Sequence, residues 1–396
     1  MGASALARST LATVVPLYAV AQGLAPVWVG LLVALPNALP VALGTTAGRH
    51  VDKGGAGRWL LVGAAGMASA PAMLVAVPTV PVLALAQLVL GAFQLAAVLA
   101  AQAFVASLSR DEAYERDFAT YGAVMSAGRL MGPLLAGVAI DLAGFRAGFA
   151  AALVGTLVTM IGAAALWREA PAGSDEGALI GATGATGATG SASGAGVSAP
   201  APQRYGARQA WRVVAVRLAV VASAGVFVAI SVRQAFLPVL LESEGFAATT
   251  IGAVLSLGSL ASVTVRPFTP WIARRLGGVA PTLVVTMSVV GLGVGLLGVA
   301  GSLPLYALLS VMAGLGTGVG LPMSAVAIVR RVGYGERATA LGLRLASNRG
   351  AQLSAPIVVG AVIGATGFAA GFGVAGAVVA ALAVAATRLG RRYVRG

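Results

Sequence analysis

Charged residues are scarce in this chain. They make up 10% of its 396 residues, whereas a soluble domain carries about 25%. So few charges cannot cover a water-facing surface of this size. Apolar residues account for 58% of the chain, and they occur in long runs rather than in the 3.6- or 2-residue stripes of soluble helices and strands. This pattern favours a protein surrounded by lipid.

Side chains that serve as nucleophiles or metal ligands are also few. The chain has no cysteine and one histidine, His50, so disulfides, Cys-based zinc sites, a thiol nucleophile and a Ser-His-Asp triad have no basis. The only lysine, Lys53, is followed by glycine, which excludes a Walker A motif. A Gly-x-Gly-x-x-Gly pattern at 293–298 lies inside an apolar run and is typical of helix packing. We therefore expect no enzymatic activity, cofactor or metal.

Acidic residues are missing from the middle of every apolar run. Of the 12 Asp and Glu residues, three lie in one set of connections: Asp141, Glu242 and Glu244. The others lie in or beside the connections that carry the basic residues: Asp52, Asp111, Glu112, Glu115, Asp117, Glu169, Asp175, Glu176 and Glu336. Because carboxylates are the usual proton carriers in membrane pumps, their positions argue against a standard proton relay.

The apolar runs predict an all-α polytopic membrane protein with twelve spans, since a hydrocarbon core of about 30 Å needs about 20 helical residues. The first six spans are expected at 4–23, 27–48, 59–77, 80–105, 117–141 and 147–167. The last six are expected at 213–240, 248–271, 279–299, 304–328, 338–363 and 368–388.

Basic residues alternate along the connections. They gather after the even-numbered spans and in the C-terminal tail, whereas the other connections hold few. The positive-inside rule then places both termini and the central connection in the cytoplasm. Arginine-rich loops on one side of a membrane also explain the net charge of +14 without nucleic acid as a partner.

One long hydrophilic segment interrupts the spans at residues 168–211. It contains GATGATGATGSASGAG and APAP, and such a composition buries too little apolar area to offset its ordering entropy. The segment predicts a flexible cytoplasmic linker between two six-helix bundles, residues 1–167 and 212–396.

The two predicted bundles are copies of one pattern. The pattern P-x3-G-x6-G-F-x2-G-F begins at Pro133 and again at Pro356. A shift of 222 residues also aligns Pro16 with Pro238, as well as other landmarks in the early spans. Six spans per copy give both copies the same orientation, an architecture found in transporters whose substrate site lies at the midplane between the halves.

The connection after the second span resembles a motif of the major facilitator superfamily, G-x3-D-[RK]-x-G-[RK]-[RK]. The matching residues are Gly48, Asp52, Lys53, Gly55 and Arg58, with two extra small residues before the arginine. The resemblance covers essentially the whole chain and implies a gating role for these residues. Asp52 is expected to pair with an arginine or cap a helix in one transport state; the alternative is a solvated turn.

Two further segments carry the same resemblance. The weaker second copy of the loop motif contains Arg266, Arg274 and Arg275, with Arg274 at the acidic position. Span 5 resembles the G-x3-G-P-x2-G-G motif of proton-linked antiporters, with Ala136 in place of one glycine, through Gly128, Gly132, Pro133 and Gly137. These residues are expected either to act in conformational change or to serve helix packing alone.

Some positions depart from the antiporter pattern. Span 4 of many such antiporters carries R-x3-G, but this chain has Gln87 and Gly91 there, and Ala119 replaces a glycine upstream in span 5. The departures weaken the implied proton coupling.

Two arginines lie deep in predicted spans. Arg129 is about 12 residues into span 5 and Arg349 about 11 into span 11, which places both near the midplane at 1.5 Å per residue. An unpaired charge there costs several kcal/mol. An anionic substrate is one source of counter-charge; the alternative is that both arginines bond to carbonyls freed near Pro133 and Pro356, or extend toward the interface.

Uncharged polar residues in the spans complete the candidate substrate site, although helix packing explains each of them equally well. The candidate substrate-binding residues are Asn37, Gln94, Arg129, Asn348, Arg349 and Gln352. Arg233 and Gln234 are expected nearer the outer mouth.

The sequence thus predicts a secondary transporter of the bacterial inner membrane that acts as a monomer in lipid. The family motifs favour efflux of a small organic solute in exchange for protons. One alternative is a facilitator or exchanger for an organic anion bound by Arg129 and Arg349, and another is a membrane receptor that transports nothing.

Overall fold

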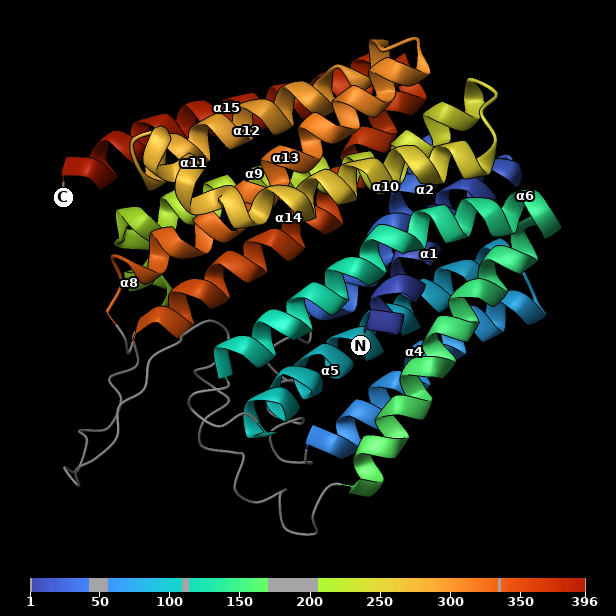
Figure 1. Ribbon diagram of the computed structural model, residues 1–396. Coiled ribbons are helices and arrows are strands. Elements are labelled where there is room, and N and C mark those ends of the chain that lie inside the picture. Colours follow the sequence, from blue (N-terminus) through green and yellow to red (C-terminus); the bar gives the residue numbers. More distant parts are fainter. Residues whose placement is uncertain (1, 43–55, 109–113, 170–205, 334–335, 396) are drawn as a thin grey trace.

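The computed structural model describes residues 2–42, 56–108, 114–169, 206–333 and 336–395. Within these ranges the secondary structure is entirely helical, and most helices run side by side in two bundles (Figure 1). The expected all-α class is confirmed.

Long apolar helices with short turns build the first bundle. A glycine with positive φ, Gly144 at 77°, breaks the last of them into two antiparallel helices. The elements are α1 (Gly2–Ala21), α2 (Pro26–Ala34), the 3-10 turn η1 (Leu35–Asn37), α4 (Ala56–Ala76), α5 (Val80–Leu108) and α6 (Tyr114–Glu169).

The second bundle repeats this order. The turn that corresponds to Gly144 is at Gly367, whose φ is 89°. The elements are α8 (Ala207–Arg212), α9 (Val214–Ser243), α10 (Ala248–Val265), η3 (Arg266–Phe268), α11 (Thr269–Arg275), α12 (Val279–Gly295), η4 (Leu297–Val299), α13 (Leu303–Val329), α14 (Arg337–Thr366) and α15 (Phe368–Arg395).

The described helices account for twelve spans. Nine are long and apolar enough to cross a membrane, and one of these, Gly122–Leu166, contains the two halves of α6. The apolar helix at Pro26–Ala42 and the 30-residue α14 complete the set, because nine plus one plus two is twelve. The boundaries of the predicted linker stay a prediction, since 170–205 lie outside the described residues.

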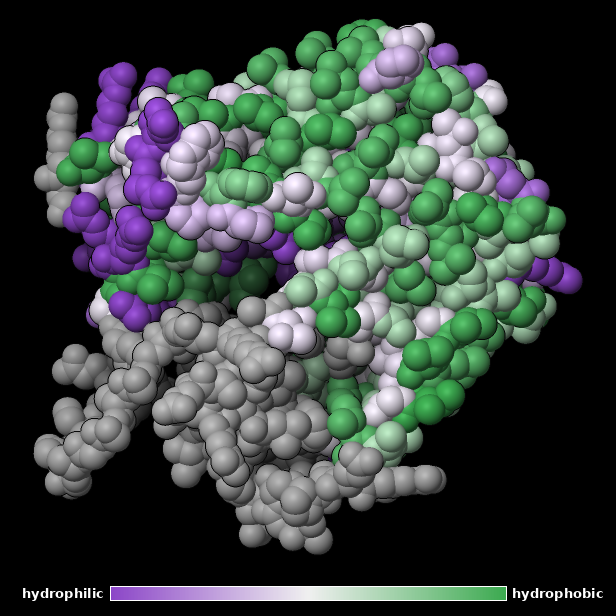
Figure 2. Space-filling view, in the orientation of Figure 1, coloured by the Kyte–Doolittle hydropathy of each residue, from purple (hydrophilic) through white to green (hydrophobic). Residues whose placement is uncertain are grey.

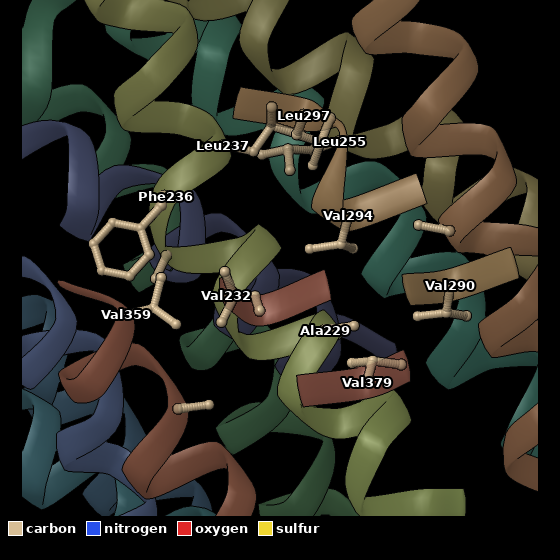
Figure 3. Packing of buried hydrophobic residues seen from close by; sticks show 14 of the residues in the cluster. Ala229, Val232, Phe236, Leu237, Leu255, Val290, Val294, Leu297, Val359 and Val379 are labelled. Atoms are coloured by element: carbon tan, nitrogen blue, oxygen red, sulfur yellow. The ribbon is translucent and has the colours of Figure 1, made fainter. Parts of the chain in front are cut away.

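Helix α9 lies at the centre of the second bundle. Its side chains Val232, Phe236 and Leu237 are fully buried. Figure 3 shows them facing the buried valines of neighbouring helices, among them Val359 of α14 and Val294 of α12. Such a packed interior supports α9 as a rigid wall for the space between the bundles.

The bundles meet through glycines placed against proline or alanine carbonyls. A β-carbon on Gly30 of α2 would collide with the Pro356 carbonyl of α14, and one on Gly252 of α10 would collide with the Pro133 carbonyl of α6. Gly360 meets the Pro26 carbonyl, and Gly137 meets that of Ala248, in the same way. We call Gly30, Gly137, Gly252 and Gly360 the glycine seam. Because 222 and 223 residues separate the paired glycines, the repeat makes the same contact twice.

A carboxylate adds a polar contact beside the seam. The Asp141 oxygens accept hydrogen bonds from the backbone N–H groups of Ala248 and Thr249, at 3.0 and 2.7 Å. Asp141 belongs to the first bundle and the N-terminus of α10 to the second, so a helix cap spans the two bundles.

The seam and the Asp141 cap lie at the end of the molecule that also holds the turns between α1 and α2, within α6, and between α9 and α10. At this end, which we call the closed end, the bundles are in contact (Figure 1). Toward the opposite end the bundles diverge, and Figure 2 shows the surface hollowed between them, with hydrophilic side chains in the hollow.

Candidate functional site

A small cavity of about 60 Å³ lies between the two bundles. Helices α1, α2 and α5, with η1, provide one wall, and α9 and α14 provide the other. The lining residues are Arg8, Leu11, Ala12, Val15, Val33, Pro36, Asn37, Gln87, Leu90, Gln94, Ser231, Gln234, Arg349 and Gln352. Polar groups therefore converge where two apolar bundles face one another.

Two guanidinium groups enter the cavity from opposite bundles. Arg349 of α14 donates a hydrogen bond from Nη1 to Oδ1 of Asn37 at 3.0 Å. Arg8 of α1 lies near enough to Arg349 and Arg129 for their charges to repel. No carboxylate is among the lining residues, so the described cavity has an excess of positive charge.

Backbone carbonyls that prolines leave free hold two of the cavity amides or neighbouring groups in place. Proline has no N–H, so Pro36 leaves the Leu32 carbonyl without its helical donor. Gln87 is buried and donates to that carbonyl from Nε2 at 3.1 Å. Gln352 donates from Nε2 to the Asn348 carbonyl at 3.2 Å. Their carbonyl oxygens thereby have a fixed direction.

Arg129 lies beside this cavity and does not line it. Its backbone carbonyl, freed by Pro133, accepts a hydrogen bond from the Ser9 hydroxyl at 2.9 Å. A serine therefore satisfies the carbonyl that the sequence offered as an acceptor for arginine. The Arg129 side chain is exposed and contributes positive charge near Arg8.

The other predicted binding residues separate into two groups. Asn37, Gln94, Arg349 and Gln352 line the cavity, so the fold brings together four of the six candidates. Asn348 is buried, with 3% of its surface exposed, and its Oδ1 has no hydrogen-bond partner. Its place in the helix interior favours a packing role.

The predicted glycines of span 5 lie at helix contacts. Gly128 and Gly132 face the backbone of α1, at Gly2 and Leu6 respectively. Pro133 and Gly137 belong to the contact with α10. These residues position helices around the cavity and lie outside its lining.

The predicted gating arginines are dispersed. Arg266 donates from Nη1 to the Ser126 hydroxyl at 3.0 Å, which joins α6 to the end of α10. Arg275 lies over the Trp271 ring at 5.6 Å, and Arg58 and Arg274 are exposed. Gly48, Asp52, Lys53 and Gly55 lie outside the described residues, so their gating role stays a prediction.

The sequence gave no reason to place Arg8, Gln87 or Ser231 in the site. Arg8 is close to the start of its span, where an arginine commonly extends to the membrane interface. One signal was available for Gln234, which corresponds to the cavity residue Ala12 at a shift of 222 residues.

Sequence and structure comparisons identify this architecture. The family model described as Major Facilitator Superfamily matches residues 1–300. No curated protein sequence matches the chain significantly.

Solved transporters share the fold over the whole chain. A peptide transporter POT in complex with sulfate is 16% identical, with a TM-score of 0.76 over 100% of this chain and 93% of that one. The nucleoside transporter NupG is 15% identical, with a TM-score of 0.74 over 98% and 96% of the two chains. A bacterial homologue of the human lysosomal transporter Spinster, inward-facing and occupied, is 14% identical, with a TM-score of 0.75 over 100% and 94%.

The family match, the two six-helix bundles and the polar cavity between them agree. The chain is a multi-pass membrane transporter of a small molecule, not an enzyme, and it belongs to the Major Facilitator Superfamily.

Proposed function

We propose that this protein is a secondary transporter that moves a small organic anion by alternating access. The observation that carries the proposal is the pair of arginines, Arg8 and Arg349, in a cavity whose lining holds no carboxylate. A buried guanidinium without a counter-charge costs several kcal/mol. An anionic substrate supplies that counter-charge when it binds.

The size of the cavity supports a small substrate. Its volume of about 60 Å³ is far below the roughly 300–1,000 Å³ of sites for drug-sized ligands. The amides of Gln94 and Gln234 offer both donors and acceptors to the uncharged part of such a substrate.

The proposed orientation follows from the arginine-rich connections. We place the closed end outside the cell and both termini in the cytoplasm of a bacterium, with the protein as a monomer in the inner membrane. In this orientation the bundles diverge toward the cytoplasm, and the structure corresponds to an inward-facing state. Transport then requires the glycine seam and the Asp141 cap to separate.

The experiment is binding and flux in proteoliposomes with Arg8→Gln and Arg349→Gln. Each substitution removes one positive charge from the cavity, so we expect at least a 10-fold loss of affinity for small carboxylates. Arg388→Gln is the matched control because Arg388 is exposed on α15. Normal anion binding by both cavity variants would overturn the proposal.

Proton-linked efflux is the second candidate, and the antiporter-like motif that includes Gly128 and Gly137 favours it. Those glycines pack against α1 and α10, and the cavity lining includes no carboxylate to carry a proton. Flux measured with and without a pH gradient separates the candidates, since transport that ignores the gradient excludes proton coupling.

A further inference from the structure

Arg349 is held by a neutral acceptor from the opposite bundle. Its Nη1 donates to Oδ1 of Asn37 at 3.0 Å, from α14 to η1. Asn37 is half-buried and lines the cavity. This hydrogen bond therefore crosses the path that a substrate takes between the bundles.

A carboxylate is a stronger acceptor for a guanidinium than an amide is. Charge-assisted hydrogen bonds are about twice as strong as bonds with a neutral acceptor, and a carboxylate engages both arms of the arginine fork. An anion that reaches the cavity can therefore displace Asn37 from Arg349. The amide keeps Arg349 in place while the site is empty and yields to the substrate.

Arg8 has no such acceptor among the described residues. It lies half-buried in the cavity wall formed by α1 and is repelled by Arg129 and Arg349. A monovalent anion would neutralise one of the two cavity arginines and leave the other charge in place. A divalent anion would neutralise both and remove their mutual repulsion.

We propose that the cavity selects a divalent anion that bridges Arg8 and Arg349, and that Asn37 is the specificity-determining residue displaced from Arg349 when this anion binds. The inference rests on the proposed anion transport and adds the substrate's charge. Because the two arginines belong to different bundles, one bound dianion would also draw the bundles together.

The test exchanges the neutral acceptor for a charged one. Asn37→Asp provides Arg349 with a permanent counter-ion, so the cavity keeps one uncompensated arginine. We expect binding of succinate, a four-carbon dianion, to fall at least 10-fold, while binding of butyrate, its monovalent counterpart, is retained. Isothermal titration calorimetry on the purified full chain measures both, and sulfate serves as a compact dianion.

Two companion variants keep the test falsifiable. Asn37→Ala removes the competing amide without adding charge, so succinate should bind at least as tightly as to the unchanged protein. Gln234→Ala alters the cavity lining without touching either arginine and controls for general damage. If Asn37→Asp does not fold, Asn37→Ala still decides the role of Asn37, since a weaker affinity for succinate would overturn it.

The outcomes separate this inference from the proposed function. Equal affinity of the unchanged protein for succinate, sulfate and butyrate, lost in Arg349→Gln, keeps anion transport and overturns selection of a dianion. Unchanged succinate binding by Asn37→Asp overturns the role of Asn37. Binding of neutral solutes but of none of the three anions overturns the proposed function itself.

Discussion

Arg233 is a buried guanidinium inside the second bundle. Its side chain is 8% exposed, and its Nη1 atom has no hydrogen-bond partner. An unsatisfied buried polar group destabilises the fold by about 1–3 kcal/mol, and more when it is charged. Arg233 is thus a site at which the native side chain opposes stability.

Arg233→Met should therefore raise the free energy of unfolding by about 1–3 kcal/mol, because an apolar side chain of similar length fills the same space. Thermal unfolding in detergent measures the change, and Arg388→Met is the exposed control. A lower melting temperature for Arg233→Met would show that the guanidinium has a stabilising partner.

The residues of the site differ in how far the sequence could predict them. Depth in a span pointed to Arg349 and the repeat pointed to Gln352, because both signals are local in the chain. Arg8 was not predictable, because its distance from Met1 suggested the interface. Its place in the cavity depends on how α1 packs on α6, where Gly128 and Gly132 let the helices approach.

Among the elements, α6 and α10 form a junction that depends on one cap. Asp141, at the turn within α6, accepts two hydrogen bonds from the first residues of α10. An N-terminal cap is worth about 0.5–2 kcal/mol. Because this cap joins different bundles, its energy belongs to the closed arrangement alone.

Asp141→Ala should shift the population away from the closed end by about 5- to 30-fold, which corresponds to about 1–2 kcal/mol. Spin labels on Leu142→Cys and Val299→Cys measure the separation, since both residues are exposed and the chain has no cysteine of its own. Glu242→Ala is the exposed control. An unchanged distance distribution in Asp141→Ala would contradict a stabilising role for the cap.

The spans themselves were predictable to within a few residues in most cases. Span 5 was expected at 117–141 and its helix begins at Tyr114; span 12 was expected from 368 and α15 begins at Phe368. Apolar length and turn glycines are local signals, so they set these limits. The Asp141 cap was not predictable, because it joins residues 107 and 108 positions apart.

At the scale of the whole molecule, the glycine seam holds the bundles together through backbone contact. The repeat that the sequence contains predicted two bundles with one orientation. The choice between states could not be predicted, because both arrangements of the bundles share one sequence and differ in energy by only a few kcal/mol.

Gly252→Leu should drive the closed end apart, because its side chain would meet the Pro133 carbonyl. Overpacking of such a contact costs about 1–3 kcal/mol, so the closed population should fall by about 5- to 150-fold. The control is Gly342→Leu, since a β-carbon at Gly342 meets nothing within 4 Å. Closed-state distances between labels at positions 142 and 299 in Gly252→Leu would refute this role of the seam.

The uncompensated arginines of the cavity have a consequence for energetics across the bilayer. Moving one elementary charge through a membrane potential of 100 mV involves about 2.3 kcal/mol. A carrier that returns empty takes the charges of Arg8 and Arg349 through part of this voltage, whereas a carrier loaded with a dianion is electrically balanced at the site. The unloaded return is therefore the voltage-sensitive half of the cycle, and an interior-negative potential holds the empty cavity toward the cell interior.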